Sequence, residues 1–132
     1  MSKFEKLKLR EQAAKINYAD AVFKLARTYF DGKNKERDFC ILILFLNCGL
    51  RLSELVGINL TDIKGDTLRV LGKGNKERFV YFGSACRKAI DAYLPERNKK
   101  FLSDNRALFG SRDNNRISVT AVHRLIKKYL LK

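Results

Sequence analysis

The chain has 132 residues, 45% of them apolar, so the sequence predicts one domain with a hydrophobic core and excludes wholesale disorder. It carries 28 lysines and arginines against 14 aspartates and glutamates, which gives a formal net charge of +14. A surplus of this size repels itself unless a polyanion is near. Nucleic acid is therefore the first partner to consider, and an anionic membrane surface the second.

Membrane insertion and secretion are not indicated. The longest strongly apolar run, Cys40 to Leu46, is far shorter than the ~20 residues that span a bilayer, and the charged N-terminus lacks the apolar segment of a signal peptide. The three cysteines form no CxxC pair, which predicts free thiols in a reducing cytoplasm, buried as small apolar side chains: Cys40, Cys48 and Cys86. With His123 as the one histidine and no cysteine cluster, a structural zinc site is not expected.

The first half of the chain has a helical pattern. Apolar residues recur every three to four positions from Tyr18, which predicts a helix that ends by Gly32. A second helix is expected from Lys35 to Cys48. Its centre is apolar all round, so it should be buried on every side, and Gly49 should end it. A short helix, Leu52 to Val56, follows.

Three short strands are expected next, around Ile63, from Thr67 to Leu71, and from Arg78 to Phe82. They alternate or are rich in β-branched and aromatic residues, and glycine-containing turns separate them at Gly65 and at Gly72 to Asn75. This pattern is typical of a small antiparallel meander.

The last part of the chain returns to helices. Ser84 is a good N-cap for a helix from Ala85 to Leu94. A basic loop is expected from Arg97 to Arg116, interrupted by an apolar tripeptide. Ser118 then caps a last helix, Val119 to Leu131, which has one apolar face and one basic face.

Together these elements predict an α+β, mainly helical domain over residues 18–132, in which helices flank a small three-stranded antiparallel sheet. Residues 1–17 are charged and are interpreted as a leader or the remnant of a linker. The sequence has no internal repeat and no low-complexity tract.

One arginine directly follows a helix stop, in the stretch CGLRLSEL at residues 48–55. Arg51 should lie on rigid backbone close to the core, where a guanidinium needs a partner. Glu54, three residues later, can supply part of one. Two interpretations are open: a structural salt bridge, which is common at this spacing, or a guanidinium whose remaining donors grip a phosphate.

A second stretch, GKGNKER at residues 72–78, occupies the turn between two predicted strands. Glycines let a backbone approach a ligand closely, and Lys73 at the tip can reach a phosphate or protonate a leaving oxygen. An ordinary solvated basic hairpin fits the composition as well. The GxxxxGK[ST] pattern of a Walker-type phosphate loop is absent.

In this order, the two stretches resemble the tyrosine recombinase (phage integrase) family, in particular its Xer-like and transposon-integrase branch. The resemblance continues through ALFGS at 107–111 and RIS at 116–118, and it covers residues 18–131, the first part of the catalytic domain. It implies binding to double-stranded DNA. In the complete enzyme it implies DNA recombination and integration through a 3′-phosphotyrosine, without a metal or other cofactor.

The resemblance also implies roles for individual residues. Arg51 matches the catalytic arginine that holds the scissile phosphate, and Glu54 matches the acidic position that orients this arginine. Lys73 matches the hairpin lysine that protonates the leaving 5′ oxygen. Further phosphate contacts are expected at four cations that are equally consistent with solvated surface charges: Lys76, Arg78, Lys127 and Lys128.

The family's HxxR motif, its next His or Trp and its late tyrosine nucleophile do not follow these motifs. His123 is expected to be a partly exposed helix residue and Tyr129 a core residue, so neither replaces them. We therefore expect this chain alone neither to cleave nor to join DNA. Core surface left open should favour self-association, whereas full-length family members form tetramers on DNA in the cytoplasmic nucleoid.

A function from another class is also open. A non-catalytic DNA-binding or regulatory module with a recombinase-like fold would keep the positive charge but not the catalytic activity. The sequence downstream in the gene distinguishes this module from a fragment of an enzyme. An unrelated RNA-binding domain is disfavoured, because the aromatic RNP pattern and the GxxG placement of common RNA-binding modules are absent.

Overall fold

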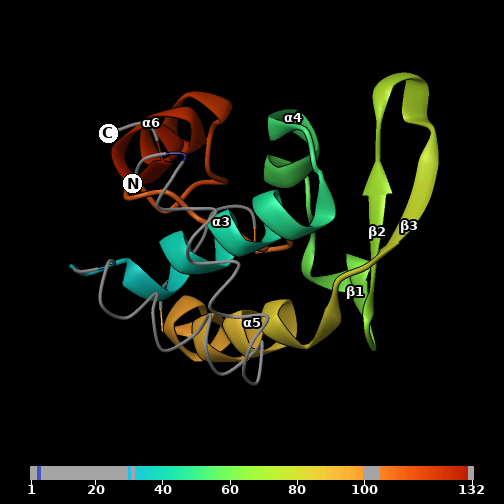
Figure 1. Cartoon of the computed structure of the whole chain (residues 1–132). Coiled ribbons are helices and arrows are strands. Elements are labelled where there is room, and N and C mark those ends of the chain that lie inside the picture. Colours follow the sequence, from blue (N-terminus) through green and yellow to red (C-terminus); the bar gives the residue numbers. More distant parts are fainter. Residues whose placement is uncertain (1–2, 4–29, 31, 100–104, 131–132) are drawn as a thin grey trace.

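The computed structural model describes residues 3, 30, 32–99 and 105–130, and Figure 1 shows how their helices and strands are arranged. The helix predicted from Tyr18 lies outside the described residues up to residue 29, as does the leader apart from Lys3. The described part has four α-helices and a three-stranded antiparallel sheet, so the predicted α+β, mainly helical fold is confirmed.

Helix α3 (Lys35–Cys48) forms the centre of the fold, with the bounds that the sequence predicted. Every residue from Phe39 to Leu44 is buried, and this run exceeds one helical turn, so the helix is covered on all sides. It packs against α5, α4 and α6, which surround it in Figure 1. Gly49 ends it in the left-handed conformation, with φ 62°.

The sheet lies at one edge of the molecule, in the order β1-β2-β3. Strand β1 (Ile63–Lys64) pairs with β2 (Thr67–Leu71), which pairs with β3 (Glu77–Tyr81). The third strand was predicted one residue too late. Phe82 is buried beneath the start of the next helix, and its N–H donates to the Asp66 carbonyl at 3.1 Å.

Helix α5 (Gly83–Asn98) is longer than predicted at both ends, and the predicted N-cap, Ser84, lies inside it. The helix continues past Pro95, although proline removes one backbone hydrogen bond. Tertiary contacts explain the extension: the buried Arg97 donates from Nε and Nη2 to the Ala107 carbonyl, at 3.0 and 2.7 Å. The loop predicted from Arg97 therefore begins later.

In the segment before the last helix, the predicted apolar tripeptide belongs to the core, whereas the residues from Arg112 to Asn115 are exposed. Ala107, Leu108 and Phe109 are each at most 1% exposed. Isolated β-bridges join this segment to Asn59 and to its own continuation at Arg116. Ala107, Leu108 and Phe109 form the apolar tripeptide that interrupts the basic stretch in the sequence. Their apolar side chains explain why they are buried.

Helix α6 (Val119–Leu130) begins where predicted, and the Ser118 cap is confirmed: its Oγ accepts the Ala121 N–H at 3.1 Å. Tyr129 is buried, as expected, and its ring stacks on Phe30 with the ring centroids 4.3 Å apart. His123 is exposed.

The cysteines are free thiols, as predicted. Cys40 and Cys86 are buried, whereas Cys48 is half-buried at the end of α3. Within the described ranges, no helix combines the length and the apolar character that a bilayer crossing needs.

Candidate nucleic-acid interface

Arg51 stands at the N-terminal boundary of helix α4 (Leu52–Val56), directly after the turn that ends α3. Leu50, the residue before it, is 3% exposed and anchors the turn in the core, whereas Arg51 itself is exposed. The backbone at Arg51 is extended, with φ −75° and ψ 154°. The result is a solvent-facing guanidinium on a fixed base, which is the arrangement that a phosphate contact needs.

Glu54 is the buried carboxylate of this region, and its side chain is 4% exposed. Its Oε1 accepts the backbone N–H of Arg51 at 2.8 Å. The guanidinium of Arg78 on β3 donates Nη1 to Oε2 and Nη2 to Oε1, the latter at 3.3 Å. The side-chain salt bridge that the spacing allowed between Arg51 and Glu54 is thus replaced by an ion pair with Arg78.

The same contacts keep Glu54 charged. The hydrogen bond from the Arg78 side chain lowers the pKa of the Glu54 carboxyl despite its burial. The Arg51 N–H and the positive charges of both arginines act in the same direction.

The turn between β2 and β3 lies against this carboxylate. A Cβ atom added at Gly72 would stand 3.1 Å from Glu54 Oε2, so the backbone passes where a side chain would be crowded. The Gly72 N–H donates to the Lys76 carbonyl at 2.8 Å and closes the turn. Lys73 and Lys76 are exposed on it, and Figure 1 places the turn at the same end of the molecule as α4.

A second arginine, Arg116, forms hydrogen bonds at the C-terminal end of α4. Arg116 Nη1 donates to the Val56 carbonyl at 2.9 Å and to the Ile58 carbonyl at 3.2 Å, and Nη2 donates to Asn59 Oδ1. It therefore satisfies backbone acceptors at the end of the helix whose start carries Arg51.

Sequence reasoning missed this role of Arg116 and the pairing of Arg78 with Glu54. The partners are 24 residues apart for Arg78 and 57 to 60 apart for Arg116, and no local pattern signals such pairs.

The two lysines predicted on the last helix lie apart from this group. Lys127 and Lys128 are exposed near the end of α6, which packs against α4. The Lys128 ammonium stands 5.0 Å from the centroid of the Tyr129 ring. They extend the positive surface of the molecule along α6.

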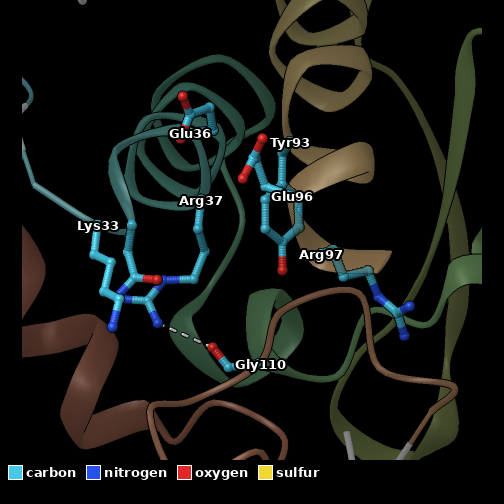
Figure 2. Close-up of a pocket in the computed structure, with 8 residues that line it drawn as sticks. Lys33, Glu36, Arg37, Tyr93, Glu96, Arg97 and Gly110 are labelled. Carbon is cyan, nitrogen blue, oxygen red and sulfur yellow. Dashed lines mark hydrogen bonds between the residues drawn. The ribbon is translucent and has the colours of Figure 1, made fainter. Parts of the chain in front are cut away.

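Two hollows lie among the described residues. A cavity of about 30 Å³ is lined by residues of α3 and α5, and Arg37 Nη1 donates to the Gly110 carbonyl at 3.0 Å in its wall. Figure 2 shows the side chains that line it. The wall also includes Tyr93, whose hydroxyl donates to the Leu108 carbonyl at 2.8 Å and whose pKa burial raises to about 12. A wider hollow of about 230 Å³ lies between α4 and β2. The described residues contain no cluster of three potential metal ligands.

The class of this protein follows from comparison with known proteins. Residues 15–132 match the Phage integrase family, so the chain belongs to that family. It is 58% identical over 100 residues to tyrosine recombinase XerC of Caldanaerobacter subterraneus subsp. tengcongensis, covering 76% of this chain and 28% of that protein. It is 37% identical over 131 residues to XerC of Thermodesulfovibrio yellowstonii, covering 93% of this chain and 44% of that protein.

Solved structures show the same fold. XerA recombinase superposes with a TM-score of 0.64 at 26% identity, over 71% of this chain and 35% of that chain. XerH site-specific recombinase, bound to its difH substrate, superposes with a TM-score of 0.69 at 17% identity, over 98% of this chain and 35% of that chain. The predicted family resemblance is confirmed. The chain spans less than half the length of these relatives.

Proposed function

We propose that this chain is the DNA-binding first part of the catalytic domain of a site-specific tyrosine recombinase. The observation that carries the proposal is the joined unit of α4 and the β2–β3 turn, in which Glu54 connects the backbone of Arg51 to the strand that follows Lys73. Arg51 and Lys73, two cations of different chemistry, are exposed on this unit, and Figure 1 shows α4 and the β2–β3 turn at the same end of the molecule.

In this proposal Arg51 binds the scissile phosphate, and its guanidinium stabilises the charge that develops there. Lys73, on the exposed turn, donates the proton that the leaving 5′ oxygen needs. Glu54 fixes the backbone of Arg51 and is not itself a phosphate ligand, because it is a buried anion. In the complete enzyme these groups act with a tyrosine nucleophile that becomes linked to a 3′ phosphate.

The partner is double-stranded DNA. The net charge of +14 and the exposed positions of Lys76, Lys127 and Lys128 support it, and so does the fold shared with XerH, which was solved on its difH substrate. We extend the proposal to assembly as a tetramer on paired sites in the full-length enzyme, to self-association of this chain through open core surface, and to action at the nucleoid in the cytoplasm.

The test is a titration of the protein against a labelled DNA duplex at several salt concentrations. About five phosphate contacts predict a slope of log K against log salt of about −4 to −5. Arg51→Ala and Lys73→Ala should each weaken binding roughly tenfold near 0.1 M salt and flatten the slope by about one unit. Lys99→Ala is the matched control, because Lys99 is an exposed lysine at the end of α5, paired with Glu96 at 3.0 Å.

Binding that is weakened by the first two variants and unchanged in the control supports the proposal. Salt-independent binding, no binding at low salt, or equal loss in all three variants would refute it.

A further inference from the structure

Arg78 was expected to be either a phosphate contact or a solvated surface charge, and in the structure its guanidinium forms an ion pair with Glu54. We propose that Arg78 is a positioning residue: by holding Glu54, it sets where the turn that carries Lys73 stands relative to Arg51. The inference rests on the proposed function in one respect, since it takes Arg51 and Lys73 to act on the same phosphate.

One carboxylate connects the two sides of the site. Glu54 Oε1 accepts both the Arg51 N–H, at 2.8 Å, and Arg78 Nη2, at 3.3 Å, while Oε2 accepts Arg78 Nη1. A carboxylate whose side chain is 4% exposed is costly without a cation, because water cannot solvate it. Glu54 therefore requires Arg78, and the pair draws β3 toward α4.

The sheet register explains why Arg78 can reach this carboxylate. Arg78 stands opposite Val70, so both side chains leave the sheet on the same face. Val70 is 1% exposed there, whereas the side chain of Arg78 is 45% exposed and reaches Glu54 at the edge of this face. The next residue, Phe79, is 66% exposed on the other face. A register shift of one residue would turn Arg78 away from Glu54 and destroy the link.

Both ends of the turn thus lie near the same carboxylate. Arg78 binds it from β3, and Gly72, directly after β2, lies so close that a Cβ atom there would stand 3.1 Å from Oε2. Lys73 is the next residue after Gly72, so the backbone position of Lys73 depends on where Gly72 lies relative to Glu54. In this arrangement the charge of Arg78 is matched by that of Glu54, and Arg78 adds little net attraction for DNA.

The two roles predict different measurements. A phosphate ligand at position 78 would make Arg78→Gln flatten the salt slope by about one unit, with an effect that adds to that of Lys73→Ala. A positioning residue leaves the slope nearly unchanged. It also makes Lys73→Ala almost silent in the Arg78→Gln background, because the misplaced lysine no longer contributes.

The experiment is a double-variant cycle of Arg78→Gln and Lys73→Ala in the DNA titration. Arg69→Gln is the matched control, since Arg69 lies on the opposite face of the same hairpin and pairs with Asp62 and Glu77 at 3.2 and 3.1 Å. We expect Arg78→Gln to weaken binding about five- to tenfold, Arg78→Lys to restore part of this loss, and the control to leave the Lys73→Ala effect intact. Additive effects with a flattened slope would overturn the inference.

A second measurement does not depend on DNA. In the free protein, NMR titration of the Glu54 carboxyl carbon should give a pKa below the ordinary glutamate value, and hydrogen exchange of the Gly72 amide should be slow, because it donates to the Lys76 carbonyl. Arg78→Gln should raise that pKa and speed that exchange, and Arg69→Gln should do neither. Unchanged values in Arg78→Gln would overturn the positioning role even if DNA binding fails. If wild type does not bind DNA but these values change, the proposed function fails while the Arg78 contact stands.

Discussion

Replacement of Arg116 tests whether its hydrogen bonds at the C-terminal end of α4 stabilise the fold around Arg51. The Arg116 guanidinium donates to the Val56 carbonyl at 2.9 Å, to the Ile58 carbonyl at 3.2 Å and to Asn59 Oδ1. Arg116→Gln keeps a polar side chain but is too short to reach all three acceptors. Arg116→Lys keeps the charge near the helix end but loses the fork of donors.

The expected loss follows from these contacts. Hydrogen bonds from a charged donor contribute about 1.5–3 kcal/mol each, which would give a total well above 4 kcal/mol for three fully buried bonds. Arg116 is half-buried, and water can replace part of what is lost, so we expect about 2–3 kcal/mol for Arg116→Gln and about half of that for Arg116→Lys. At about 4 °C per kcal/mol, the melting temperature should fall by roughly 8–12 °C and 4–6 °C.

Thermal unfolding followed by circular dichroism measures this loss, with Arg112→Gln as the matched control, because Arg112 is an exposed arginine in the same segment. The salt-dependent DNA titration should show weaker binding for Arg116→Gln with an unchanged slope, since a support is lost and not a phosphate contact. A melting temperature of Arg116→Gln within about 2 °C of wild type would refute the reasoning.

Three further results are expected. Cys48 is half-buried, and a hydrogen bond from Cys86 lowers the pKa of its thiol, so it should react with Ellman's reagent before the other two thiols. Cys40 and Cys86 should react later, because burial raises the pKa of Cys40 and the hydrogen bond to Cys48 raises that of Cys86; a fast phase that survives in Cys48→Ser would contradict this. Because the folded-state pKa of Glu54 is lowered, its stabilising effect is complete above the unfolded value of about 4.3 and is lost as the pH falls through the folded value. The stability gap between wild type and Glu54→Gln should therefore narrow below about pH 4.3 in urea titrations, and a gap constant with pH would show that the carboxylate charge is unimportant. Ser118→Ala should cost about 1 kcal/mol through loss of the α6 cap, with Ser118→Asp close to wild type; equal urea midpoints for Ser118→Ala and wild type would exclude a role for the cap.

Much of this fold could be predicted because its signals are local. The uninterrupted apolar centre of Lys35–Cys48 and the glycine after it define a buried helix and its end. Alternation places Leu68 and Val70 on the buried face of β2, and a serine at position 118 marks the start of α6. The Arg51 and Lys73 positions followed from short motifs in a characteristic order. Each of these signals lies within a few residues of the structure that it predicts.

What the tertiary structure decided concerns mostly which charges act together. The end of α5 was misplaced because Arg97 binds a carbonyl ten residues away and holds the helix beyond Pro95. Likewise, an arginine in a basic hairpin looks the same in sequence whether it faces a phosphate or a carboxylate. Arg78 faces Glu54 because the strand register turns it to the face of the sheet on which this buried carboxylate lies. The sequence alone determined the local elements and the family. Long-range packing determined which arginines support the site and which remain exposed, because a buried carboxylate such as Glu54 needs an opposite charge that only the folded chain brings near it.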